Sequence, residues 1–113
     1  MKIIYNKILP TKKFKAINLF GIIFVRKEHG TLTNIQLNHE SIHTAQAKEM
    51  LFLFFYIFYV FEWLFRLIQY RNSMEAYYNI SFEREAYENQ DNPNYLKQRK
   101  FYSFIKYYSK KQH

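Results

Sequence analysis

The sequence has no cysteine, which excludes a disulfide framework, a thiol nucleophile and a thiolate metal site. Glycine and proline number only two each, too few for a turn-rich small β-barrel. Acidic residues are also scarce, with 9 Asp+Glu against 17 Lys+Arg, so the formal net charge is +8. Aromatic residues, in contrast, make up 21% of the 113 residues, and this excludes a disordered or linker-like chain. We expect one folded domain over residues 1–113, in which any metal must be bound by His and carboxylate ligands.

The pattern of apolar residues predicts a mainly α chain (α+β) with a short N-terminal β segment. Residues 22–25 are β-branched and aromatic and follow Gly21, as in a buried or edge strand. A helix is expected to begin near Thr33 or Asn34, either of which can cap it, and to continue through the apolar stretch that follows. Further helices are expected over residues 81–89 and, after a turn, over about 95–108.

Two apolar runs raise the question of a membrane. Residues 16–25 follow a basic segment, but charged residues come next instead of a small-residue cleavage site, so the chain has no convincing signal peptide. Residues 50–68 are more apolar, yet their uncharged part covers only about 18 Å as a helix, against a hydrocarbon core of about 30 Å. Glu62 and Arg66 follow at a spacing that pairs them on one helix face. A full membrane span is therefore not favoured.

A helix that is apolar all round is either buried by protein or lies partly in lipid, and its aromatic rings suit a membrane interface. Residues 97–113 carry six basic residues and no acidic one. This basic tail is either a solvated helix end or a segment attracted to an anionic membrane surface. No nucleic-acid motif accompanies it, so nucleic acid is not an expected partner. The chain is expected to be cytoplasmic or peripherally membrane-associated.

The residues most informative about function are His39-Glu40-Ser41-Ile42-His43, an H-E-x-x-H sequence early in the expected helix. Positions four apart lie on the same helix face, so both imidazoles can bind one metal ion. The Glu after the first His is placed to reach a metal-bound water without ligating the ion. The pattern predicts a catalytic metal site with Glu40 as the general base.

A catalytic zinc needs a third protein ligand, and no His follows at the short spacing known from H-E-x-x-H-x-x-G-x-x-H sites. A carboxylate is therefore expected. Glu49 would point away from His43 on a straight helix, and Glu62 would lie roughly 28 Å along it. The remaining downstream candidates are Glu75, Glu83, Glu85, Glu88 and Asp91.

The sequence Phe82-Glu83-Arg84-Glu85-Ala86-Tyr87 resembles the E-x-x-A-D segment of gluzincin metallopeptidases, particularly the CAAX prenyl proteases and the related heat-shock membrane peptidases. This resemblance implies a minimal gluzincin that binds Zn²⁺ through His39, His43 and Glu83, with Ala86 as a small packing residue. The chain departs from the family at Tyr87, where the family has an Asp that braces a zinc-binding histidine. Glu85 is about 200° around the helix from Glu83, so only one of the two can face the metal.

The expected activity is zinc-dependent hydrolysis of a peptide or protein substrate. Zinc would lower the pKa of a bound water toward ~7, and Glu40 would take its proton and deliver it to the leaving amine. Candidate oxyanion donors are Tyr77, Tyr78 and Tyr87. Residues 20–25 either match the edge strand that holds extended peptide in many zincins or form an ordinary strand that covers the core, and both can hold.

Ligand convergence also constrains the path of the chain. Residues 71–82 can return at most about 40 Å, so we expect a bend of the long helix near residues 62–71. The aromatic helices then pack as a hairpin or lie in the membrane interface without crossing it. Gln46, one turn after His43, is either a partner of that histidine or a plain polar residue.

Two other function classes stay open. A non-catalytic zinc-binding protein would bind the ion without turnover. A basic, aromatic-rich module that binds membrane or protein would bind no stoichiometric metal, and H-E-x-x-H would then be accidental.

Overall fold

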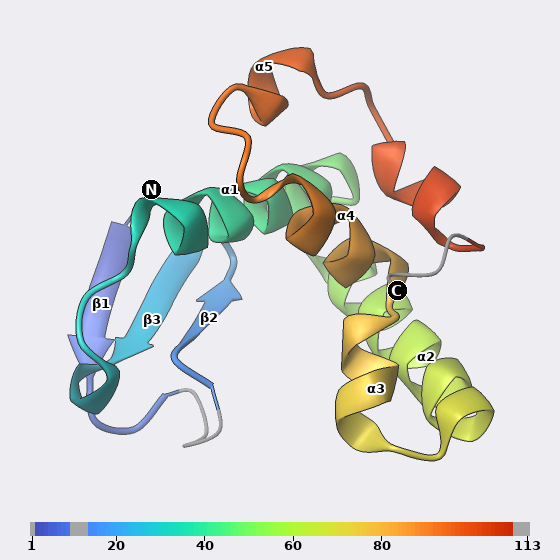
Figure 1. Cartoon of the computed structure of the whole chain (residues 1–113), viewed down its shortest axis with the longest axis horizontal. Helices are drawn as coiled ribbons and strands as arrows, with labels where there is room; N and C mark the ends of the chain where they lie inside the picture. The colour runs from blue at the N-terminus through green and yellow to red at the C-terminus, as the bar shows by residue number, and fades with distance from the viewer. Residues whose placement is uncertain (1, 10–13, 110–113) are drawn as a thin grey trace.

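The structure is a computed structural model that describes residues 2–9 and 14–109, and it confirms a mainly α chain with a small sheet (Figure 1). The basic residues of segments 10–13 and 110–113 lie outside the described residues. The elements in chain order are β1 (Lys2–Asn6), β2 (Ala16–Leu19), β3 (Ile22–Arg26), the 3-10 turn η1 (Lys27–His29), α1 (Asn34–Glu49), α2 (Leu53–Tyr70), α3 (Ser73–Tyr78), α4 (Ser81–Asn89), α5 (Tyr95–Gln98) and the 3-10 turn η2 (Ser103–Tyr107).

The three strands form one sheet in the order β1-β3-β2, with β3 parallel to β1 and antiparallel to β2. Phe20 and Gly21 form the tight turn between β2 and β3, both at positive φ (54° and 83°). This left-handed conformation matches the strand twist, and glycine adopts it without strain. Because β3 is the central strand and its Ile23 and Val25 are fully buried, the structure supports the buried-strand alternative for residues 20–25 and not the edge strand. The edge strand beside α1 is β2, whose Asn18 side chain donates to the Glu40 carbonyl and to Thr44 Oγ1.

Helix α1 begins at the expected cap but does not continue through the apolar stretch. Thr33 and Gln36 form a reciprocal capping box, in which each side chain accepts from the other's backbone N–H. After Glu49 the helix breaks, with Leu51 and Phe52 at φ 54° and 58°. Such values cost a non-glycine residue about 1–2 kcal/mol each. Packing of Met50 and Phe52 against the buried core offsets this cost. The core consists of Ala47, Phe55, Ile80, Phe82 and Phe104.

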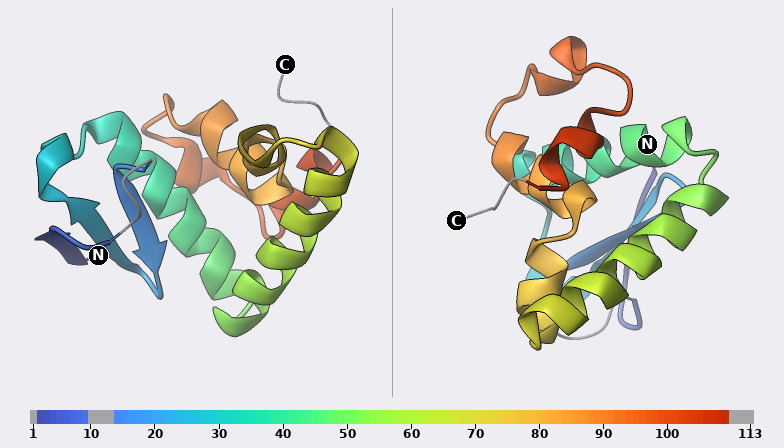
Figure 2. Two further views of the ribbon diagram at one scale, coloured as in Figure 1. Left: turned by 90° about the horizontal axis from the view of Figure 1, so that it is seen from below. Right: turned by 90° about the vertical axis from the view of Figure 1, so that its right-hand side faces the viewer.

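A second reversal follows α2. Arg71 adopts a left-handed conformation. The Asn72 side chain caps α3 by accepting from the backbone N–H groups of Met74 and Glu75. The expected bend near residues 62–71 is therefore confirmed at its C-terminal end, while the break at residues 50–52 was not foreseen. Helix α2 runs along the outside of the molecule with α3 packed on it, and α4 lies inside, against α1 (Figure 2).

The expected helix over residues 81–89 is confirmed as α4, and its first six residues are all buried. The expectation of one helix over residues 95–108 is wrong. The segment forms α5 and η2 instead, and the chain between them includes Tyr102 at φ 57°. Tertiary contacts explain the division: Glu49 accepts from the Tyr102 backbone N–H and from the Arg99 guanidinium. These hydrogen bonds to the buried Glu49 carboxylate replace the backbone hydrogen bonds that a continuous helix would form here.

Candidate metal centre

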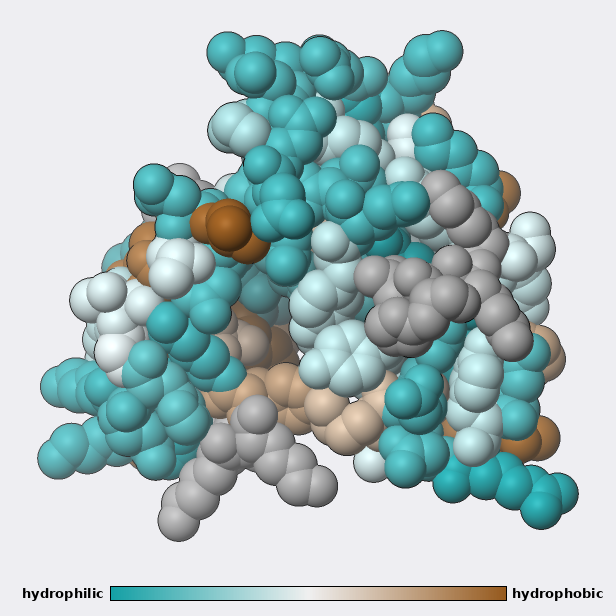
Figure 3. Space-filling view, viewed as in Figure 1, coloured by the Kyte–Doolittle hydropathy of each residue, from teal (hydrophilic) through white to brown (hydrophobic). Residues whose placement is uncertain are grey.

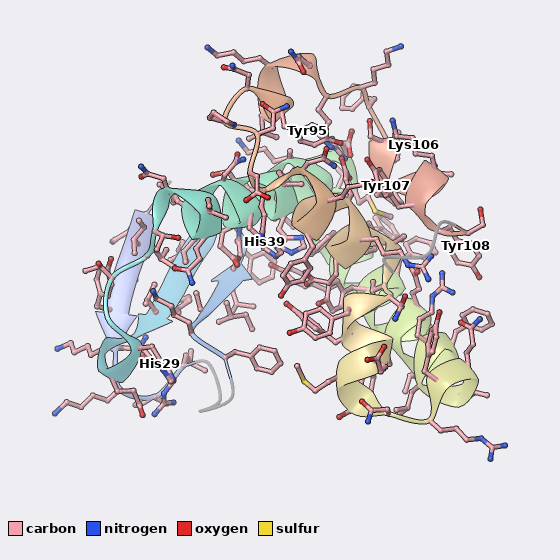
Figure 4. All side chains as sticks on the ribbon, viewed as in Figure 1. His29, His39, Tyr95, Lys106, Tyr107 and Tyr108 are labelled. Carbon is pink, nitrogen blue, oxygen red and sulfur yellow. The ribbon has the colours of Figure 1, made fainter. Side chains whose placement is uncertain are left out.

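Three buried side chains meet between α1 and α4. Nε2 of His39 lies 3.1 Å from Glu83 Oε1, Nε2 of His43 lies 3.0 Å from the same oxygen, and the two Nε2 atoms are 3.1 Å apart. All three residues are less than 8% exposed. Figure 4 shows His39 directed into the molecule and His29 at the far end of the sheet, away from this cluster. Of the candidate carboxylates, Glu83 is the one that joins the two histidines.

This triangle of donors fits a metal ion. Three ligands bound at about 2.0–2.1 Å in tetrahedral geometry lie about 3.3–3.4 Å from one another, close to the spacing of these atoms. His39, His43 and Glu83 could therefore hold one ion with a coordination position left open. Electrostatics agree. Burial disfavours the charged form of His43, yet Glu83 raises the pKa of its imidazole to about 9. Although burial opposes it, both imidazoles hold the pKa of Glu83 well below its usual range. Without a metal, the cluster thus holds a proton between His43 and Glu83, at the place where a cation would lie.

Gln46 sets the tautomer of His43. Its Nε2 donates to Glu85 Oε1 (2.9 Å) and to the Phe82 carbonyl (3.0 Å), both of which only accept. Its Oε1 must therefore face His43 Nδ1, 2.8 Å away, and accept the ring proton. In the neutral ring that binds a metal, the lone pair of His43 is then on Nε2, the atom that faces the metal position. Of the two interpretations of Gln46, the structure supports the histidine partner.

This arrangement predicts an effect on metal affinity. Gln46→Met keeps the side-chain volume but removes the acceptor at Nδ1, and we expect the affinity for a divalent metal ion to fall about 10–100-fold. Competition with a chromogenic chelator measures the change, and Gln98→Met, on the exposed surface of α5, is the matched control. Equal affinities for the two variants would show that Gln46 does not orient His43.

His39 is held by Gln90 and not by the residue at position 87, where the gluzincin family has an Asp that braces a histidine. Its Nδ1 lies 2.8 Å from Gln90 Oε1, and Asn38 fixes that end of α4 by donating to the Gln90 carbonyl. Tyr87, which stands where the family has an Asp, makes no hydrogen bond to the ring but packs against it edge-on with centroids 4.4 Å apart. Sequence reasoning missed Gln90, although residues 83, 87 and 90 follow the spacing of a single helix face.

Tyr59 is a second residue that the sequence did not reveal. Its hydroxyl, from the inner side of α2, donates to Glu83 Oε2 at 2.5 Å, and this leaves Oε1 to the histidines. Burial, with the adjacent Glu83 carboxylate, raises the pKa of Tyr59 well above its ordinary value, so the phenol remains a donor at neutral pH. Tyr59 lies 24 residues from its partner, and no local spacing signals the contact.

Glu40 lies at a cleft beside the three donors. The cleft has a volume of about 460 Å³ and opens on the face shown in Figure 3, where the hollow has apolar side chains at its floor. Glu40, His43 and Glu83 line it together with β2 and the inner side of α2. Burial is the main cause that raises the pKa of Glu40, and the nearby Glu83 adds to it, whereas the two histidines lower it. A carboxylate with a raised pKa in a cleft is suited to proton transfer.

The three tyrosines considered as oxyanion donors differ in position. Tyr77 lines the cleft together with Glu40 and Glu83, whereas neither Tyr78 nor Tyr87 does. The Tyr77 hydroxyl is 3.0 Å from that of Tyr87, and burial followed by Glu83 raises its pKa well above the ordinary value. Tyr77 is thus a protonated phenol at the cleft wall.

No family model, curated protein or solved structure matches this chain. The interpretation of the site therefore depends on its own geometry.

A buried network of charged side chains lies on the side of α4 that faces away from the metal position. Arg99 donates to Glu85 Oε2 (2.5 Å) and to Glu49 Oε1 (2.9 Å), and Tyr95 also donates to Glu85. Burial lowers the pKa of Arg99, but the two carboxylates outweigh it and raise the pKa. As expected, only one of the two glutamates faces the metal position: Glu83 faces it, and Glu85 faces away. Glu85 instead connects this network to Gln46 and through it to His43.

Glu62 has a structural role. Its carboxylate accepts from the backbone N–H and the hydroxyl of Ser81 at the start of α4, and it forms the expected pair with Arg66. It thereby ties α2 to the helix that carries Glu83.

Proposed function

We propose that this chain is a zinc-dependent peptidase, a minimal gluzincin whose zinc ligands are His39, His43 and Glu83. The observation that carries the proposal is the convergence of two Nε2 atoms and Glu83 Oε1 within 3.1 Å of one another, beside Glu40, in an open cleft. Two histidines and a glutamate with an open position are the donor set of a catalytic rather than a structural zinc. When bound, zinc would polarise the scissile carbonyl and make a coordinated water more acidic.

Glu40 is the proton carrier in this scheme. Its carboxylate takes a proton from the attacking water and later gives it to the amine that leaves. The raised pKa of Glu40 suits both steps, because it brings the proton affinity of the carboxylate closer to the working pH, where the group can both take up and release a proton. Tyr77, protonated at the cleft wall, would donate to the oxygen that gains negative charge.

Strand β2 offers a backbone edge to a peptide. Lys15 O accepts from the β3 residue Arg26, so by the alternation of antiparallel strands the groups of Ala16, Asn18 and Phe20 point away from β3. The Tyr56 hydroxyl already donates to Asn18 O and accepts from Phe20 N–H. An extended substrate would therefore pair at Ala16 and at the Asn18 N–H, and Tyr56 would end the pairing.

Metal content tests the ligand set. We expect elemental mass spectrometry on untagged protein to find about one zinc ion per chain, because three neutral or anionic donors converge. Glu83→Gln should abolish stoichiometric zinc. Glu88→Gln, the matched change at an exposed position of α4, should retain it. Equal retention by both variants would contradict Glu83 as a ligand. Absence of zinc from the wild type after zinc is supplied would contradict the proposal as a whole.

A measurement of peptide hydrolysis tests whether the metal-bound protein is a peptidase and whether Glu40 is its general base. Hydrolysis of an unstructured peptide library by the zinc-loaded protein, abolished by Glu40→Gln, is the expected result. Full zinc occupancy without any hydrolysis would favour the non-catalytic zinc-binding protein.

A further inference from the structure

The outward side of α2 is apolar along its whole length of about 27 Å. We call it the outer face of α2, and its residues are each 39–78% exposed: Leu53, Phe54, Ile57, Phe58, Val60, Phe61, Leu64, Phe65 and Ile68. Their spacing places them on one continuous arc of the helix. Contiguous apolar patches of this size are rare on soluble monomers and indicate a site of interaction.

The charges of α2 are turned away from this face. Glu62 has a side chain only 10% exposed and binds Ser81, and Arg66 is 4% exposed and donates to Glu62 and to the Tyr108 carbonyl. Glu49, the other acidic residue between positions 49 and 74, is buried against Arg99. The outer face therefore presents no exposed anion.

Exposed cations stand at both ends of the outer face. Lys48 lies in the last turn of α1, and Arg71 follows α2 directly. Lys106 extends from η2 on the outside of the molecule (Figure 4). An uncharged apolar strip bordered by cations, on a chain of net charge +8, complements the anionic headgroups of a lipid bilayer.

Two neighbouring features extend the apolar strip. Phe20 (62% exposed) and Leu51 (74% exposed) project from the turns at the N-terminal end of α2, and Phe20 packs on Tyr56. On the other side, a groove of about 490 Å³ separates α2 from η2, with Phe58, Phe61 and Ile105 among its lining residues. Its lining is mostly apolar, apart from Glu62 and Ser81, which bind each other, and it suits an acyl chain.

The opposite side of α2 is occupied by contacts with the rest of the fold, which do not suit a helix that crosses a membrane. Tyr59 donates to Glu83, Glu62 caps α4, and Phe55 packs on Phe82 with ring centroids 4.8 Å apart. Although α2 is long and apolar enough to cross a membrane, crossing would place these contacts in lipid. Only the outer face is available to the bilayer, with the helix parallel to the membrane plane.

We infer that the chain docks on an anionic lipid surface through the outer face of α2, half-embedded and without spanning the bilayer. Docking itself does not depend on the peptidase activity. Its consequence for substrate does rest on the proposed function: the β2 edge, joined to the outer face through Tyr56 and Phe20, would lie close to the headgroups. The substrates would then be polypeptide segments that leave a membrane.

Vesicle flotation tests the docking. The wild type is expected to float with phosphatidylcholine vesicles that contain phosphatidylglycerol, and more weakly with phosphatidylcholine alone. Phe58→Asp/Phe61→Asp should lower the partition coefficient at least about tenfold. Ile8→Asp/Ile35→Asp, at exposed apolar positions away from α2, should leave it unchanged. Lys48→Gln/Arg71→Gln/Lys106→Gln should abolish the preference for anionic vesicles, whereas Lys2→Gln/Lys7→Gln/Lys27→Gln should not.

Three results would overturn the inference: no flotation of the wild type, flotation that survives Phe58→Asp/Phe61→Asp, or a stable dimer in light scattering that the same double change dissociates. The last would make the outer face a contact between two copies. Zinc content and hydrolysis of a soluble peptide, measured on the same variants, separate this inference from the proposed function. Flotation without hydrolysis contradicts only the peptidase, and hydrolysis without flotation contradicts only the docking.

Discussion

Glu40→Gln is expected to reduce peptide hydrolysis by about 10²–10⁴-fold while zinc content stays at the wild-type level. The amide occupies the same volume but cannot accept the proton of the attacking water. Glu40 is not one of the three converging donors, so the metal site should persist. Initial rates with a quenched fluorescent peptide, together with elemental analysis of the same preparations, measure both effects.

Glu75→Gln, on the exposed surface of α3, is the matched control and should keep full activity. If Glu40→Gln retained hydrolysis within a few-fold of wild type, Glu40 would not be the general base. If instead it lost zinc, its carboxylate would have to be counted among the ligands.

Arg99→Met is expected to lower the free energy of unfolding by about 3–5 kcal/mol. The change leaves Glu85, which is fully buried, and Glu49, whose side chain is 3% exposed, without their shared cation. An uncompensated buried carboxylate is costly because no water replaces the lost partner. Urea denaturation followed by circular dichroism measures the loss, with Arg71→Met as the exposed control.

Adding Glu85→Gln to Arg99→Met should restore part of the stability, because it removes one of the two stranded charges. A loss below about 1 kcal/mol for Arg99→Met alone would mean that the network contributes little. Arg99→Met alone should also weaken zinc binding, because Arg99 holds Glu85, Glu85 orients Gln46, and Gln46 orients His43.

Short-range features of the candidate site could be predicted from the sequence. His39 and His43 needed only a helix to bring them to one face, and the Thr33 cap marked where that helix begins. Helix α4 was predicted at its observed bounds, and helix geometry predicted that only one of Glu83 and Glu85 could face a metal, while the family resemblance indicated Glu83. These relations lie within one helical turn, where backbone geometry decides them.

The path of the chain between the two motifs could not be predicted. A helix through residues 50–52 satisfies every local preference, and the break there requires two strained residues. Packing of Met50 and Phe52 against the core that contains Phe55 and Phe82 offsets that strain, and this core joins residues far apart in sequence. The supporting bonds from Tyr59 to Glu83 and from Gln90 to His39 have the same origin.

Sequence alone determined the donor types, because without cysteine only histidine and carboxylate could bind a metal, and it determined that both histidines share a helix face. Tertiary structure decided that Glu83 completes the triangle, that β2 rather than β3 is the edge strand, and that α2 turns its charges inward and its apolar residues outward. The reason is physical. Periodicity specifies which side chains share a face, but the direction of that face depends on which other elements pack against it.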